Sequence, residues 1–199
     1  MVEYLLIATV ILAPPSRPLS QVRDRHFLYV ATESGIEQYR LTPHGRPVPL
    51  TPARVAIDGR AFTLKLGPTC RYVYVPECDY FDVAQFRIGR NGALYQLHPF
   101  LAHADAHPSD IVFHPSGRFA YVLNSHGSIS QYAVHRNGHL VPMQPTEIIV
   151  SENGQRDPSD LLFVGRNRAR VRVSTTDGAG RIIELIVDKD GRLGRVRPN

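Results

Sequence analysis

The sequence predicts an all-β protein: a β-propeller-like array of about four four-stranded antiparallel blades. A strand-like segment of six residues occurs four times, at 36–41, 83–88, 129–134 and 182–187. Each is followed by a short polar turn that ends in glycine, and these glycines (Gly45, Gly92, Gly138 and Gly191) lie 47, 46 and 53 residues apart. A repeat of about fifty residues with several short strands is typical of propellers. No long segment has the apolar spacing of an amphipathic helix.

Composition and repeat together favour one array over two separate domains. The chain has 199 residues, of which 43% are hydrophobic and 21% charged, which is a globular composition with enough apolar material for a core. We assign residues 1–25 to an N-terminal apolar strand, or a signal peptide, with a linker. Residues 26–199 form the four repeats, at about 26–59, 60–107, 108–157 and 158–199.

The first repeat lacks a clear opening strand unless residues 2–12 provide it. Residues 5–13 are an apolar run of signal-peptide length, but Glu3 precedes them and no Lys or Arg does, so the basic start of a signal is missing. The run is too short to span a bilayer as a helix. We therefore expect a buried strand and a cytoplasmic protein. The alternative is a cleaved signal at residues 1–13 and a secreted or periplasmic protein.

The second and third repeats supply the blade pattern. The second has strand-like residues 61–66 and 71–75 around a turn. In the third, the most complete, residues 108–113 precede a Pro-Ser-Gly turn, in which proline presets φ and glycine allows positive φ. Strands at 119–123, at 128–134 and from Leu140 onward complete the unit. Four antiparallel strands in a unit of this length make one propeller blade.

The fourth repeat begins like the third and then departs from it. Residues 158–163 nearly copy residues 108–113, whereas Arg166, Arg168, Arg170 and Arg172 alternate along the next segment. On a strand, this spacing places four guanidinium groups on one face. Two readings stay open: a solvated outer strand of a weak terminal blade, or an anion-binding ridge.

Residues 113–124, followed by Ile129-Ser130-Gln131-Tyr132, resemble the YVTN-type repeat of the lactonase-like β-propellers. This family includes 6-phosphogluconolactonases and muconate-lactonising enzymes, and the resemblance covers about residues 26–196. It implies seven blades, whereas four are present here. An open arc of blades exposes strand edges, which favours association. The chain could close as a four-bladed ring, pair with a second copy, or be a fragment.

The resemblance also points to catalytic positions, and the chain departs from them. The family's lactonases carry a histidine directly after the proline that opens a blade, and here Ser109 and Ser159 stand there. A serine cannot replace imidazole as an acid or base near neutral pH. The family's glutamate after Tyr-Val-x-Asn corresponds to Ser125 in the third repeat and to Glu33 in the first; Glu77 falls one place earlier in the second.

We therefore expect a non-catalytic scaffold that binds a small ligand or a protein through its loop face, with ligand contacts from Arg118, Asn124 and His126. The first alternative is hydrolysis of a sugar lactone by water activated at Glu33 or at a site around His107. The second is a truncated, inactive paralogue.

A histidine-rich segment lies between the second and third repeats. His103, Asp105 and His107 alternate, so an extended chain would turn all three to one side. Imidazole with carboxylate suits zinc or manganese. The simpler reading is an inter-blade loop that is rich in histidine, so we expect no cofactor, with a divalent metal at these three residues as the alternative.

The formal net charge of +5 is modest, and 21 of the 23 basic residues are arginines, because only Lys65 and Lys189 are lysines. A dispersed charge of this size is a weak argument for nucleic acid. We expect a small-molecule or protein ligand, possible self-association through open blade edges, no nucleic-acid partner and no membrane span.

Overall fold

The computed structural model describes residues 27–32, 35–61, 63–104, 107–151, 157–174 and 180–195. These residues form fifteen strands and one short 3-10 turn, Ser125–Gly127, which confirms the predicted all-β, propeller-like fold class. All strand pairs are antiparallel and each sheet is built from strands consecutive in the chain. No helix among the described residues is long and apolar enough to cross a membrane.

We call the four sheets blades 1 to 4. Blade 1 contains β1 (Phe27–Thr32), β2 (Gly35–Leu41) and β3 (Pro47–Val55). Blade 2 contains β4 (Lys65–Leu66), β5 (Tyr72–Glu77), β6 (Asp82–Ile88) and β7 (Leu94–His103). Blade 3 contains β8 (Pro108–Phe113), β9 (Phe119–Asn124), β10 (Ser128–Val134) and β11 (Leu140–Ile149). Blade 4 contains β12 (Pro158–Phe163), β13 (Arg168–Val173), β14 (Arg181–Val187) and β15 (Leu193–Arg195).

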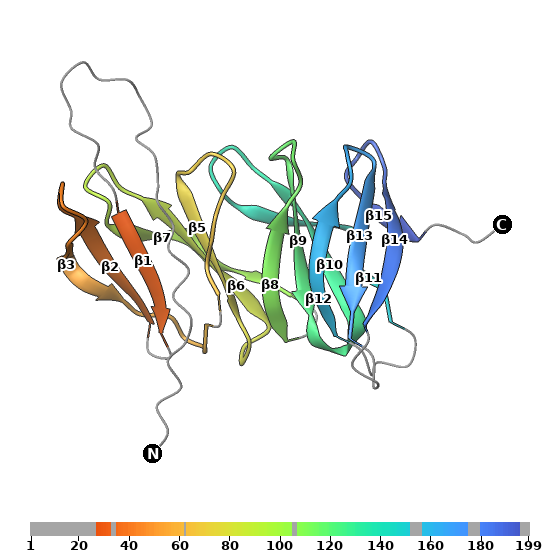
Figure 1. Cartoon of the computed structure of the whole chain (residues 1–199), viewed down its shortest axis with the longest axis horizontal. Coiled ribbons are helices and arrows are strands. Elements are labelled where there is room, and N and C mark those ends of the chain that lie inside the picture. Colours follow the sequence, from red (N-terminus) through yellow and green to blue (C-terminus); the bar gives the residue numbers. More distant parts are fainter. Residues whose placement is uncertain are drawn as a thin grey trace.

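The blades stand side by side along the long axis of the molecule, with blade 1 and blade 4 at opposite ends (Figure 1). Strand β5 lies against β8, and β9 lies against β12, so the second strand of a blade meets the first strand of the next. The described blades thus form an open arc and not a closed four-bladed ring. Blade 1 has three strands in the described part of the chain, and residues 2–12, expected to supply another, lie outside it.

The core lies between neighbouring blades. Fully buried Tyr29 and Ile36 of blade 1 pack with Val73, Val75 and Phe86 of blade 2. Two further apolar clusters join blade 2 to blade 3 and blade 3 to blade 4. Burial of apolar side chains between sheets is therefore what holds successive blades together.

A tyrosine hydroxyl crosses each of the three interfaces. It comes from β1, β5 or β9 and donates a hydrogen bond to the carbonyl of the turn glycine in the next blade. The pairs are Tyr29 to Gly92 at 2.6 Å, Tyr74 to Gly138 at 2.7 Å and Tyr121 to Gly191 at 2.6 Å.

A buried glutamine makes a second contact at each interface. Its side-chain oxygen accepts a hydrogen bond from the backbone N–H of a leucine two residues beyond the turn glycine. The pairs are Gln38 with Leu94 at 2.7 Å, Gln85 with Leu140 at 2.7 Å and Gln131 with Leu193 at 2.6 Å. Burying these amides is favourable only because their polar atoms are bonded.

Each of these three turn glycines also lies under an aromatic ring of the preceding blade. A Cβ on Gly191 would lie 2.4 Å from a ring carbon of Phe119, and Gly92 and Gly138 face Phe27 and Tyr72 in the same way. Gly191 has a φ of +82°, which other residues rarely adopt. We call the tyrosine, glutamine and aromatic contacts together the blade-joining contacts.

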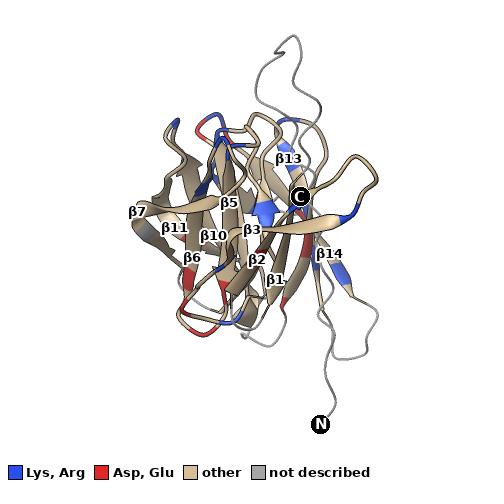
Figure 2. Cartoon of the chain, turned by 90° about the vertical axis from the view of Figure 1, so that its left-hand side faces the viewer, with Lys and Arg blue, Asp and Glu red and all other residues tan. Residues whose placement is uncertain are grey.

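The outer face of blade 4 lacks the side chains that make the blade-joining contacts. The strand register places Arg168 and Arg170 where blade 3 has Phe119 and Tyr121, and Glu184 where it has Gln131. Arg168, Arg170 and Arg172 are exposed in alternation along β13 (Figure 2), whereas Arg166, the fourth arginine of the predicted series, precedes this strand. Arg170 pairs with Glu184 at 3.0 Å.

The turn of blade 1 at the other end is also unlike the interior ones. A Cβ on Gly45 would meet nothing within 4 Å in the described structure. Pro47 takes the register position of Leu94 and has no N–H to offer a glutamine. The two end faces therefore cannot join each other by the contacts that join the interior blades.

Candidate functional site

Successive turns of an antiparallel blade lie alternately at its two ends, so the molecule has two rims. The loop rim of blades 2 and 3 holds the β5–β6 turn at 78–81, Ala104 and His107 of the β7–β8 connection, and the β9–β10 turn at 125–127. The hairpin rim holds the glycine turns. Short loops carried by a rigid sheet are the usual places for binding and catalytic groups.

His107 is the best-oriented polar group on the loop rim. Its Nδ1 lies 2.7 Å from the backbone carbonyl oxygen of Cys78. A carbonyl oxygen only accepts hydrogen bonds, so Nδ1 carries the hydrogen and Nε2 keeps its lone pair. The ring of Phe81 lies edge-on at 4.5 Å and fixes the plane of the half-buried imidazole. In the neutral form of His107, Nε2 is therefore the ring nitrogen that can bind a ligand or accept a proton.

The neighbouring thiol is not a nucleophile. The Cys78 Sγ lies 3.9 Å from His107 Nδ1. Burial, together with the charge of Asp79, raises the pKa of this thiol above its ordinary value, whereas Arg60 opposes the shift. Because thiolate is the reactive form, the pair of Cys78 and His107 does not resemble an activated cysteine site.

A second imidazole reaches the same rim from the next loop. The ring centroids of His107 and His126 are 5.8 Å apart. His126 has a φ of +69°, and its backbone N–H donates to the carboxylate of Asp157 at 2.8 Å. The contact with the connection from blade 3 to blade 4 holds His126 in this uncommon conformation. The structure therefore brings together two of the residues expected from the sequence.

Glu77 lies at the end of β5 beside this site, but it is sealed from solvent, with 0% of its surface exposed. Its Oε2 accepts the N–H of Gly59 at 2.9 Å, while Oε1 has no hydrogen-bond partner among the described residues. Burial, with smaller contributions from the charges of Asp58 and Asp82, raises the pKa of Glu77 to about 7. A sealed carboxyl cannot touch a substrate, so Glu77 acts on the stability of the rim.

The remaining expected residues fall elsewhere. Asn124 is buried, and its amide donates to the hydroxyls of Ser128 at 3.1 Å and Ser130 at 2.8 Å, within blade 3. Arg118 lies on the hairpin rim, in the turn between β8 and β9. Glu33 lies outside the described residues.

The expected metal ligands are only partly described. The side chain of His103 is 71% exposed, and its Nδ1 lies 3.4 Å from the carboxylate of Asp82. Asp105 lies outside the described residues. In the described part of the chain no three His, Cys, Asp or Glu side chains are arranged to hold a metal ion. A metal at His103, Asp105 and His107 stays a prediction.

The two serines at the family's histidine positions make hydrogen bonds within their own blades. Ser109 donates to the carbonyl of Leu123 at 3.0 Å, and Ser159 to that of Arg172 at 3.5 Å. These hydroxyls bridge adjacent strands of blades 3 and 4. Both therefore have a structural partner that accounts for their presence.

No protein-family model and no curated protein matches the chain. Its fold, however, matches solved structures. A periplasmic gluconolactonase from Pseudomonas aeruginosa is 17% identical, with a TM-score of 0.68 over 87% of this chain and 53% of that one. A putative 6-phosphogluconolactonase from Bacteroides fragilis is 15% identical, with a TM-score of 0.73 over the same shares. A functionally unknown protein from Desulfotomaculum acetoxidans, 12% identical, has a TM-score of 0.61 over 100% and 63%.

At these identities the likeness is one of fold. The chain has the fold of the lactonase-like β-propellers, as the resemblance of its third repeat to the YVTN type predicted. It spans about half the length of the two lactonase structures.

Proposed function

We propose that this chain binds a sugar lactone at the loop rim between blades 2 and 3 and hydrolyses it with His107 as the general base. The observation that carries the proposal is the hydrogen bond from His107 Nδ1 to the Cys78 carbonyl, because it makes Nε2 the nitrogen that can accept a proton in the neutral ring. The same device, an Nδ1–H held by a backbone carbonyl, orients histidines in many catalytic sites. The proposal takes up the lactonase alternative that the sequence left open.

The chemistry needs one base and one donor. His107 Nε2 takes a proton from a water molecule while the water oxygen bonds to the lactone carbonyl carbon. The carbonyl oxygen gains negative charge, which a ring N–H of His126 stabilises by donating a hydrogen bond. The ring C–O bond then breaks, and the proton held by His107 passes to the departing alkoxide. The product is the open-chain hydroxy acid, and both histidines return to their starting state.

The class of substrate rests on fold likeness. Two of the solved structures most similar to this chain bear the names gluconolactonase and 6-phosphogluconolactonase. The match covers only 53% of the length of each of those proteins, so their activity is proposed for this chain and does not follow from the likeness alone. A fold hosts many functions, so the site must carry the activity.

The test is lactone hydrolysis measured above the spontaneous rate. We expect the purified chain to accelerate loss of glucono-δ-lactone or of its 6-phosphate. His107→Gln should lower this rate by about 100-fold or more, the usual contribution of a general base. His44→Gln, on the exposed turn of blade 1, is the matched control and should leave the rate unchanged. A His107→Gln variant as active as the wild type would overturn the role of His107.

The second candidate is a non-catalytic scaffold that binds a ligand through the same rim. It is favoured by Ser109 and Ser159, which occupy the family's histidine positions and bond to backbone carbonyls instead. A scaffold would bind a lactone or its hydroxy acid saturably without changing the rate of lactone loss. Binding with turnover therefore supports hydrolysis, and binding without turnover supports the scaffold.

A further inference from the structure

A groove on the hairpin rim of blade 3 lies at the opposite end of the blade from His107. It lies between the turn that precedes β9 and the hairpin between β10 and β11, and its volume is about 660 Å³. Its lining includes Arg118, Phe119, Val134, His135, Arg136 and Asn137. Small-molecule sites commonly have volumes of about 300–1,000 Å³. The groove is therefore large enough for a ligand of sugar size.

The charges around this groove are all basic. Arg118, His135 and Arg136 line it, and no carboxylate does. Elsewhere in the described structure arginines pair with acids: Arg54 with Glu37, Arg60 with Asp79, Arg170 with Glu184 and Arg192 with Asp190. Within the described residues neither Arg118 nor Arg136 forms such a pair. Two uncompensated guanidinium groups beside one hollow attract an anion.

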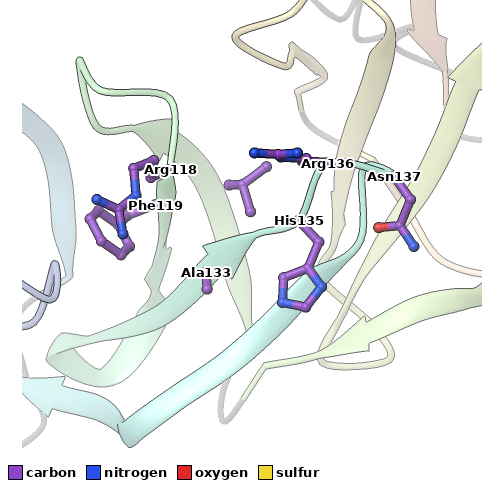
Figure 3. Close-up of a pocket in the computed structure, with 7 residues that line it drawn as sticks. Arg118, Phe119, Ala133, His135, Arg136 and Asn137 are labelled. Atoms are coloured by element: carbon purple, nitrogen blue, oxygen red, sulfur yellow. The ribbon is translucent and has the colours of Figure 1, made fainter.

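Contacts with the fold hold the Arg118 side chain and the hairpin backbone that carries Arg136. The Arg118 guanidinium lies 5.3 Å from the centre of the Phe119 ring, a stacking that limits its motion. The hairpin that carries Arg136 is fixed from blade 2, because Tyr72 donates to the carbonyl of Arg136 at 3.4 Å and Tyr74 to that of Gly138. Figure 3 shows Arg118 with Phe119 on one side of the groove and Arg136 with His135 on the other.

We propose that this groove is a binding site for a small phosphorylated molecule. The phosphate lies between Arg118 and Arg136, since guanidinium groups bind phosphate oxygens through paired hydrogen bonds. His135 and the Asn137 amide offer further hydrogen bonds, and Phe119 and Val134 contact the carbon skeleton. This site is separate from the lactone site on the loop rim, and neither needs the other.

Blade 2 provides an internal comparison. Arg71 and Arg90 occupy the turn positions that correspond to Arg118 and Arg136, as the shared backbone contacts of these turns show. The blade 2 turn, however, has Gly89 where blade 3 has His135, and neither Arg71 nor Arg90 lines the groove of blade 3. The pair in blade 2 is thus a control with the same charge and the same place in the blade.

Glucose 6-phosphate is the probe, and glucose is its neutral partner. Titration calorimetry on the full chain should show saturable binding of glucose 6-phosphate and none of glucose. The double variant Arg118→Gln/Arg136→Gln should weaken binding at least tenfold. Arg71→Gln/Arg90→Gln, which removes the same charge, should change it less than twofold. Thermal unfolding of both variants at the wild-type temperature excludes a loss of fold.

Two outcomes would overturn the proposal. One is equal weakening in both double variants, because binding would then report net charge and not this groove. The other is no saturable binding of glucose 6-phosphate to the wild-type chain. Lactone hydrolysis reports on the other rim, so its rate should be unchanged in Arg118→Gln/Arg136→Gln. If the chain does not hydrolyse lactones at all, the binding of glucose 6-phosphate in this groove is still tested independently.

Discussion

The Tyr121 hydroxyl donates a 2.6 Å hydrogen bond to the carbonyl of Gly191, which is 70 residues away in the sequence and belongs to the next blade. Burial, with a smaller contribution from the charge of Asp188, raises the pKa of Tyr121, so the hydroxyl stays a donor throughout the physiological range. Tyr29 and Tyr74 repeat this relationship at the other two interfaces. One tyrosine at each interface thus ties a blade to the turn of its neighbour.

Replacing Tyr121 with phenylalanine should destabilise the chain by about 1–3 kcal/mol, because the buried Gly191 carbonyl loses its partner. Denaturant unfolding at neutral pH measures the change. Tyr80→Phe is the control, since Tyr80 is 55% exposed, and it should change stability by less than about 0.5 kcal/mol. Equal stability of Tyr121→Phe and the wild type would mean that the interface does not depend on this bond.

Alanine substitutions at Gly191 and Gly45 distinguish the cost of backbone strain from the cost of disturbed packing between blades. Gly191→Ala should cost about 1–2 kcal/mol for its positive φ and about 1–3 kcal/mol more for the collision of Cβ with the Phe119 ring. Gly45→Ala should cost only the first of these, because its Cβ would meet open space. Chemical denaturation of both variants gives the comparison. If Gly45→Ala is as damaging as Gly191→Ala, a further blade packs against blade 1, and the open arc is wrong.

Val122 is a third probe of the blade interfaces. Its side chain is completely buried, among residues that join blade 2 to blade 3. Val122→Ala should lower the free energy of unfolding by about 1–3 kcal/mol, as for other buried aliphatic groups. Val164→Ala removes the same atoms from a side chain that is 45% exposed and should be nearly neutral. A neutral Val122→Ala would show that β9 is not packed as described.

Glu77 should make the stability of the chain fall as pH rises. Its folded pKa of about 7 lies above the ordinary value of 4.5, so the folded state holds the proton more tightly than the unfolded state. The resulting stabilisation is complete below pH 4.5 and is lost by about pH 7, a change of about 3 kcal/mol.

Glu77→Gln should remove this slope and raise stability at pH 8 relative to the wild type. Unfolding curves at several pH values between 4 and 8 test both statements. A wild type and a variant with parallel pH profiles would show that Glu77 titrates normally in the folded chain.

The repeating features of the fold could be predicted from the sequence. The spacing of Gly45, Gly92, Gly138 and Gly191 fixed the number of blades, because the same turn must close the same hairpin each time. Tyrosine and glutamine recur at equivalent positions of blades 1 to 3, but the sequence alone does not show what they contact. Their meaning became clear only when the register placed Tyr121 and Gln131 opposite the turn of the next blade.

The functional residues were harder to predict, because they lie in segments whose sequence differs from one repeat to the next. His107 was chosen for its position in a histidine-rich loop, but its tautomer depends on the Cys78 carbonyl, 29 residues earlier. The burial of Glu77 depends on residues 58–60, which no local pattern connects to it. Arg118 was expected to bind a ligand, whereas its groove partners His135 and Arg136 came from the fold.

The chain ends illustrate the same difficulty. The alternating arginines of β13 were recognised, yet their position on the outer face of blade 4 required the register of β13 with β14. No sequence pattern marks Pro47, because only its register equivalence with Leu94 shows that a backbone donor is missing. Self-association through these end faces stays a prediction. It would need contacts other than those that join the interior blades.

The most direct test of the loop rim as the functional site is a titration with glucono-δ-lactam, a neutral analogue that does not hydrolyse, followed through the histidine ring resonances. Binding at the loop rim should shift the imidazole signals of His107 and His126 together and saturably, while His44 and His135 on the hairpin rim stay unchanged. Shifts confined to His135, or no shift at His107 at saturating lactam, would contradict the assignment of the lactone site to this rim.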